Sequence, residues 1–212
     1  YRTTEETIAI RLERARKRLF QERERRIPPA RDDKILTDWN GLMIAALART
    51  GWILDEPGYL AAAEKAAAFI LTTLCRDGEL LHRYRDGEAS IPGFLDDHAF
   101  LVWGLLELYE ATFKPAHLES ALKVQDAAIA RFWDPDRGGF YFTSGDEELP
   151  LRRKESHDGA IPSGNAVSLS NLIRLGRLTG DADLEEKALA LVRAFAPNIR
   201  DSLPSHTHML SG

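Results

Sequence analysis

Leu42-Met-Ile-Ala-Ala-Leu-Ala48 is apolar at every position, and the fold follows from it. A helix that is apolar on all sides has to be surrounded by other parts of a protein. Phe100-Leu-Val-Trp-Gly-Leu-Leu106 is a second, similar stretch further along the chain. We therefore predict that both stretches belong to buried helices, which other helices cover.

Helices of the buried type alternate along the chain with helices that are apolar on one face only. We expect buried helices near residues 39–50, 98–112 and 164–178, and one-faced helices near 58–74, 116–132 and 182–196, the last ending before Pro197. Helical hairpins that cannot bury their faces alone must stack on neighbours. The pattern predicts an all-α fold with an inner and an outer layer, built as an open solenoid or a closed α/α toroid.

The connections between hairpins favour the toroid. Turns at Gly78 and Gly138 are each followed by residues typical of a short strand, at 79–84 and 140–142. Asp86-Gly87 and Ser144-Gly145-Asp146 then mark the tips of two short β-hairpins. Solenoids of helical hairpins have shorter turns, whereas long ordered connections on one rim usually build a binding surface.

Composition limits the class of protein. The chain has 212 residues, 44% of them hydrophobic, which fits one folded domain over residues 1–212. Cys75 is the one cysteine, so no internal disulfide can form. No apolar run approaches the roughly 18 residues of a membrane span. Because the sequence begins at Tyr1 without a signal peptide, we interpret it as a piece of a larger cytoplasmic protein.

A basic segment near the N-terminus raises the question of nucleic-acid or lipid binding. Residues 11–26 hold eight Arg or Lys and three Glu, whereas the whole chain has a net charge of −5. The alternative is a solvated helix over residues 4–26 with a thin apolar stripe. We favour this alternative, because the acidic remainder of the chain repels phosphate, and we expect no nucleic-acid or membrane partner.

Several segments resemble a known family. They are Arg31-Asp-Asp-Lys-Ile-Leu-Thr-Asp-Trp-Asn-Gly-Leu-Met-Ile-Ala-Ala-Leu-Ala48, Phe94-Leu-Asp-Asp-His-Ala-Phe-Leu-Val-Trp-Gly-Leu-Leu-Glu-Leu-Tyr-Glu110, Gly138-Gly-Phe-Tyr-Phe-Thr143 and Asp158-Gly-Ala-Ile-Pro-Ser-Gly-Asn165. Together they resemble the YyaL-like, spermatogenesis-associated proteins. Those proteins join a thioredoxin-like domain to a six-hairpin glycosidase-type toroid, similar to that of N-acylglucosamine 2-epimerases.

The resemblance implies that the chain is the middle part of an (α/α)6 toroid. It also implies a thioredoxin-like domain elsewhere in the parent chain, so that redox chemistry does not reside here. A partial ring exposes apolar inner faces, and such surfaces are usually covered. We therefore predict self-association through the exposed inner-ring surface, or compaction of the chain into a bundle.

In toroids of this type the loops at the starts of the inner helices face the central cleft. A sugar ligand is the expected partner there, with aspartates or histidines moving protons and aromatic rings stacking on the sugar. The candidate catalytic residues are Asp97, Asp158, His98 and His157. The candidate substrate-binding residues are Asp38, Trp39, Asn40, Asp96, Tyr84, Tyr141, Ser163 and Asn165.

Two interpretations of these helix-start residues stay open. In the first, the parent protein is a sugar epimerase, isomerase or glycosidase. In the second, the aspartates and Ser163 only cap helices, and the chain is a non-catalytic scaffold or partner-binding module attached to the thioredoxin-like domain. We expect no cofactor, and no metal, because His206-Thr-His208 lacks a third ligand nearby.

Overall fold

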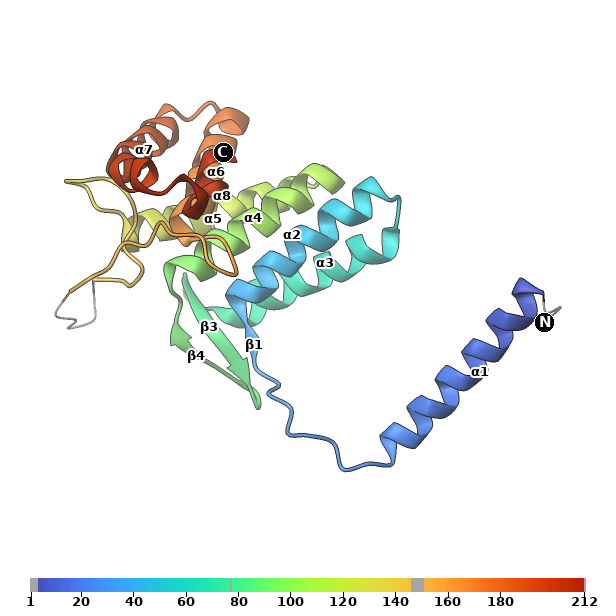
Figure 1. The fold of residues 1–212 in the computed structure, drawn as a ribbon. Coiled ribbons are helices and arrows are strands. Elements are labelled where there is room, and N and C mark those ends of the chain that lie inside the picture. Colours follow the sequence, from blue (N-terminus) through green and yellow to red (C-terminus); the bar gives the residue numbers. More distant parts are fainter. Residues whose placement is uncertain (1–3, 77, 146–150, 212) are drawn as a thin grey trace. The chain divides into compact units, whose positions relative to one another are not determined.

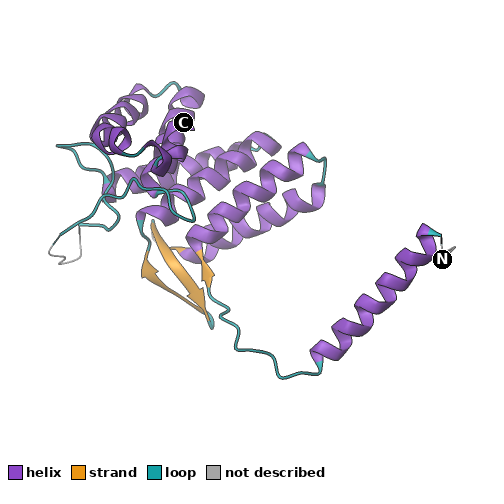
Figure 2. Cartoon of the chain, viewed as in Figure 1, coloured by secondary structure: helices purple, strands orange, loops and turns teal. Residues whose placement is uncertain are grey.

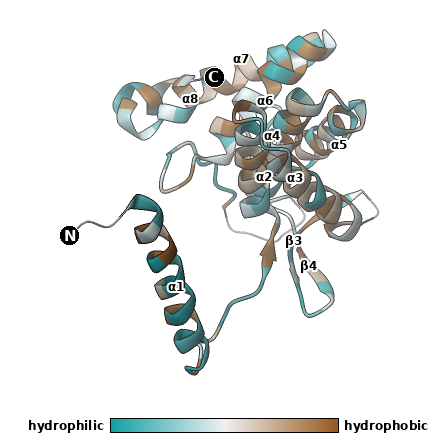
Figure 3. Cartoon of the chain, turned by 90° about the vertical axis from the view of Figure 1, so that its right-hand side faces the viewer, coloured by the Kyte–Doolittle hydropathy of each residue, from teal (hydrophilic) through white to brown (hydrophobic). Residues whose placement is uncertain are grey.

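The computed structural model describes residues 4–76, 78–145 and 151–211, and its contacts divide the chain into two units, Tyr1–Asp33 and Lys34–Gly212. The first unit holds helix α1 (Glu5–Glu24), which begins after Thr4 and buries no residue. Figure 3 shows a mostly hydrophilic helix with scattered apolar residues. This agrees with the solvated helix expected from the charge pattern, whereas a single domain over 1–212 stays a prediction.

The second unit is built from three helical hairpins (Figure 1). Its described helices are α2 (Thr37–Ile53), α3 (Pro57–Phe69) with a π-helical turn at Ile70–Leu74, α4 (Leu95–Thr112), α5 (Pro115–Phe132), α6 (Gly164–Thr179), α7 (Ala182–Asp201) and α8 (Thr207–Ser211), with a 3-10 turn at Leu203–Ser205. Helix α4 packs against α2, α5 and α6, so it is the centre of the unit.

The inner helices differ in how completely they are covered. Helix α4 is buried on all sides, with Phe100, Leu101 and Leu105 fully inaccessible, as its sequence predicts. Helix α2 buries Ile44 but exposes 56% of Met43. The prediction that 42–48 is surrounded by protein is therefore wrong for one face of α2, because no described helix of the second unit covers that side.

The outer helices α3, α5 and α7 each bury one face, as their apolar stripes predict. Helix α7 does not end before Pro197 but continues to Asp201. Proline removes one hydrogen bond from a helix and crowds the carbonyl four residues earlier, but packing of the apolar face at Leu191 and Phe195 holds the flanking turns in place. Among the described residues, no helix is long and apolar enough to cross a bilayer.

Short strands lie at the end of the unit where α2 and α4 begin (Figure 2). Strand β3 (Glu79–Arg85) pairs antiparallel with β1 (Ile35–Leu36), β2 (Cys75–Arg76) and β4 (Glu88–Pro92). The predicted hairpin tip at Asp86-Gly87 is confirmed, with both residues at positive φ. Strand β3 thus places its side chains beside the starts of two inner helices.

The prediction of a second strand at 140–142 is wrong. In the described part of the chain this segment forms an isolated bridge between Trp133 and Phe140 instead of a strand. Gly138 and Gly139 both have positive φ and turn the backbone tightly against α7. The amide of a buried side chain, Asn165, then binds the N–H and the carbonyl of Phe140, which a partner strand would otherwise use. Of the second predicted hairpin tip, Asp146 lies outside the described residues.

Candidate functional site

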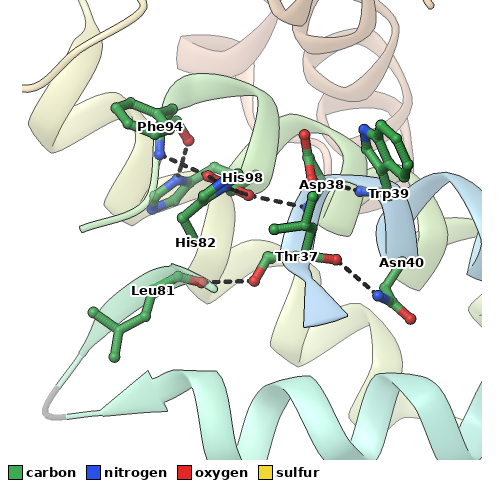
Figure 4. Close-up of polar contacts among 10 residues, drawn as sticks. Thr37, Asp38, Trp39, Asn40, Leu81, His82, Phe94 and His98 are labelled. Atoms are coloured by element: carbon green, nitrogen blue, oxygen red, sulfur yellow. Dashed lines mark hydrogen bonds and ion pairs between the residues drawn. The ribbon is translucent and has the colours of Figure 1, made fainter. Parts of the chain in front are cut away.

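The site begins with Asp97, whose carboxylate connects the starts of α2 and α4 with strand β3. Its partners Asp38, His82 and Phe94 are labelled in Figure 4. Its carboxylate is 1% exposed. Oδ1 accepts the N–H of Asp38 at 3.0 Å, and Oδ2 accepts the N–H of Phe94 at 2.8 Å. His82 Nδ1 lies 2.9 and 3.0 Å from the two oxygens. Asp97, in the first turn of α4, is therefore a buried carboxylate whose hydrogen bonds join three elements.

His82 was not predicted as a site residue. It lies on β3, and nothing in the local sequence around it distinguishes it from a surface strand residue. The hydrogen bond to Asp97 raises its pKa, with further contributions from the negative charges of Asp97 and Asp38 outweighing partial burial. Only the antiparallel pairing of β3 with β1 brings it to the helix ends.

Asp38 completes a small cluster of titratable groups with His82 and Asp97. Among the residues that the structure describes, these three offer metal-ligand atoms within 4.8 Å of one another. Burial, and then the charge of Asp97, raises the pKa of Asp38. Hydrogen bonds already account for the geometry of the Asp97 carboxylate, so the cluster is explained without an ion.

Asp96, the neighbour of Asp97 in sequence, faces a different environment. It lines a cavity of about 730 Å³ together with Glu155, His157 and Ser163. Burial raises the pKa of Asp96 to about 7, and the carboxylates of Asp97, Asp38 and Glu155 add to this effect. A Cβ on Gly164 would collide with the Asp96 carboxylate, so glycine at the start of α6 makes room for it. Asp96 is thus an acid that can hold or release a proton near neutral pH.

Three other predicted residues hold the cavity wall in place. Asp158 Oδ1 accepts the N–H of Ser163, and its Oδ2 accepts the N–H of His208 at 2.8 Å. Ser163 caps α6 through Ala166 N–H. Asn165 is fully buried, and its Nδ2 also donates to the carbonyl of Glu155 at 2.8 Å. These side chains position the segment that carries Glu155 and His157.

The predicted tyrosines lie outside the cavity. Tyr84 packs edge-on against Phe69, with ring centroids 5.3 Å apart. Tyr141 donates its hydroxyl to Asp134 at 2.7 Å, and the Arg152 guanidinium lies 4.1 Å above its ring. Both rings therefore make structural contacts in this chain.

The remaining candidates are divided between core and surface. His98 is 1% exposed, its Nδ1 lies 2.8 Å from the carbonyl of Phe94, and burial lowers its pKa. Asn40 donates to the carbonyl of Leu36 at 2.7 Å. Trp39 is 64% exposed on α2. The structure thus brings Asp96, His157 and Ser163 to one cavity, and places His98 and Asn40 in structural contacts.

Comparison with known proteins finds relatives in sequence and in fold. No protein-family profile matches the chain. Spermatogenesis-associated protein 20 is 38% identical in Homo sapiens over 221 residues and 40% identical in Mus musculus over 222 residues. Each alignment covers 97% of this chain but 28% of the relative, so the chain spans less than a third of these proteins. The resemblance to the spermatogenesis-associated family predicted from the sequence is confirmed.

Solved structures give the architecture. A family 76 α-mannanase of Bacteroides thetaiotaomicron has a TM-score of 0.63 at 17% identity, covering 82% of this chain and 46% of its own. Cellobiose 2-epimerase of Spirochaeta thermophila has a TM-score of 0.61 at 20% identity, covering 76% and 43%. A Salegentibacter α-1,6-mannanase, inactivated by asparagine at two consecutive aspartates and bound to α-1,6-mannotriose, has a TM-score of 0.61 at 12% identity, covering 76% and 46%. The predicted fold is confirmed: the hairpins are part of an α/α toroid.

Proposed function

We propose that the starts of α4 and α6 form one wall of a carbohydrate cleft in the full-length protein, and that Asp96 is the general acid for cleavage of a glycosidic bond there. The observation that carries the proposal is the raised pKa of Asp96, about 7, at the edge of a cavity of about 730 Å³. A glycosidase needs one carboxyl group that stays protonated near neutral pH to donate to the leaving oxygen.

Glu155 and Asp201 also line this cavity, and of the two it is Glu155 whose charge acts on Asp96. Glu155 is exposed, and its backbone carbonyl is fixed by Asn165. Asp96 and Glu155 therefore have different environments, one largely buried and one in water, which is how enzymes assign an acid and a base. We assign the role of base or nucleophile to Glu155, and a contact with the sugar to His157. Asp97 then acts as a positioning residue that fixes the first turn of α4.

The fold neighbours agree with this choice of chemistry. The Salegentibacter mannanase loses activity when two consecutive aspartates become asparagine. This chain also carries two consecutive aspartates, Asp96 and Asp97, at the start of an inner helix. Epimerisation of a sugar is the less favoured reaction, because His98 is buried and His82 is engaged by Asp97.

The test is a screen of mannosides, glucosides and cellobiose with the full-length protein, measured as released reducing sugar or changed product. A substrate should be turned over with a rate that falls above about pH 7, as Asp96 loses its proton. Asp96→Asn should lower kcat at least about 100-fold, the usual scale for a lost general acid. Asp126→Asn, on the exposed side of α5, is the matched control and should leave the rate unchanged. Equal rates in the two variants would contradict the proposal.

A scaffold is the second candidate function, because most of the nominated side chains are engaged in structural contacts. Asp97, Asp158, Asn165 and Tyr141 each hold backbone or a neighbouring side chain. In this case the toroid would support the thioredoxin-like domain that we place in the parent chain. The test is a calorimetric titration of the thioredoxin-like domain with the 212-residue chain. A scaffold should show saturable binding in this titration and no turnover in the sugar screen.

A further inference from the structure

The cavity that Asp96 lines also holds a serine and a histidine in direct contact. Ser156 Oγ lies 3.1 Å from His206 Nε2. The two residues are 6% and 4% exposed, and both line the cavity. They come from segments 50 residues apart, so only the tertiary fold joins them. Neither residue has a part in the proposed cleavage of a glycosidic bond.

The contacts of the His206 imidazole determine which of its two nitrogens carries the hydrogen. His206 Nδ1 is 2.8 Å from the carbonyl oxygen of Ser202. A carbonyl oxygen only accepts, so Nδ1 carries the hydrogen and Nε2 presents a lone pair. The hydroxyl of Ser156 therefore donates to Nε2. The carbonyl of Ser202 is itself fixed, because it accepts the N–H of Ser205 at 3.2 Å at the start of the 3-10 turn.

This is the arrangement of an activated nucleophile: a hydroxyl, a base within hydrogen-bond reach, and a third group that orients the base. A purely structural hydrogen bond would need neither a cavity beside it nor an oriented imidazole. The backbone N–H of His157, next to the serine, has no acceptor in the described part of the chain and is available to a developing oxyanion.

We propose that Ser156 and His206 form a nucleophile–base dyad that hydrolyses small acyl esters of polar alcohols. Ser156 Oγ attacks the acyl carbon while its proton passes to His206 Nε2. The bond from carbon to the alcohol oxygen breaks, and the alcohol leaves with that proton. Water then repeats the sequence on the acyl-serine, releasing the carboxylic acid and restoring the hydroxyl. The step needs only the ester and water, and it does not depend on the role of Asp96.

The first experiment treats the wild-type chain with a fluorophosphonate probe and maps the modified residue by mass spectrometry. We expect the phosphonyl group on Ser156. His206→Gln removes the base and should slow labelling and the hydrolysis of p-nitrophenyl acetate at least about 100-fold. Ser156→Ala should abolish both. Ser120→Ala is the control and should behave as wild type, because Ser120 does not line this cavity and its hydroxyl donates to the carbonyl of Ala116 within its own helix.

Labelling of another residue, or equal labelling of wild type and His206→Gln, would overturn the proposal, as would no labelling of a wild-type chain that melts cooperatively. The wild-type measurement needs no variant, so it decides the question even where Ser156→Ala does not fold. Because neither readout uses a sugar, failure here is distinguishable from failure of the proposed glycosidase.

Discussion

His82 Nδ1 lies within 3.0 Å of both carboxylate oxygens of Asp97, although the two residues belong to a strand and to a helix start. The same carboxylate accepts the backbone N–H groups of Asp38 and Phe94. One buried side chain therefore sets the distance between α2, α4 and β3. The position of the first turn of α4, which carries Asp96 to the cavity, therefore depends on this contact.

The His82–Asp97 contact predicts a stability that depends on pH. The pKa of His82 is raised in the folded chain, so the folded state binds the proton more tightly than the unfolded state does. The stabilisation is complete below the unfolded value of about 6.5 and is lost as pH rises through the folded value. We expect His82→Gln to lower stability by about 1–3 kcal/mol at pH 6 and by less at pH 9. Thermal unfolding at both pH values measures it, and an equal loss at both would contradict the charged pair.

Asp96 also predicts a stability that falls as pH rises, but because its charged form is disfavoured by burial rather than because a charged form is stabilised. Its pKa is raised to about 7, so ionisation is harder in the folded than in the unfolded state. Between about pH 4, where the unfolded carboxyl ionises, and pH 7, stability therefore falls as pH rises. Asp96→Asn, which keeps the shape of the side chain, should raise Tm by several degrees at pH 8 and change it little at pH 4. A variant that is no more stable than wild type at pH 8 would show that the carboxyl is not disfavoured by burial.

The close approach of α2 and α4 predicts a steric limit at Gly41. A Cβ there would lie 2.5 Å from the carbonyl carbon of Phe100, and one on Gly104 would lie 2.9 Å from the carbonyl oxygen of Gly41. Gly41→Ala should therefore push the helices apart and cost about 1–3 kcal/mol in urea unfolding. Gly58→Ala is the matched control, since nothing lies within 4 Å of its added methyl group. A control that loses as much stability as Gly41→Ala would remove the steric explanation.

The open face of α2 predicts self-association of the isolated chain. Met43 and Ile53 are 56% and 61% exposed on this inner helix, where a complete ring would have a neighbour. Sedimentation should show a concentration-dependent dimer or larger species that Met43→Lys with Ile53→Lys disperses. Leu189→Lys, on an equally exposed position of the outer helix α7, should have no effect. A strict monomer at all concentrations would contradict the prediction.

The hairpins and their layering could be predicted from the pattern of apolar residues. Apolar periodicity is a local property, so the all-round pattern of 100–106 identified the most buried helix, and the one-faced stripes identified α3, α5 and α7. Turn residues such as Asp86-Gly87 also act locally, which is why the first β-hairpin was predictable. The motifs around Asp96 and Asp97 placed the candidate site at the starts of the inner helices.

The contacts of each polar side chain at these helix starts depend on its neighbours in the folded chain. Asp96 and Asp97 are adjacent in sequence and have the same side chain, yet successive positions of a helix point in different directions. Asp96 therefore lines a cavity, whereas Asp97 binds His82 and two backbone N–H groups. His82, Glu155 and the Ser156–His206 pair became visible only when segments distant in sequence were joined. Burial, charge and hydrogen bonding are set by such neighbours across the fold, and no local pattern records them.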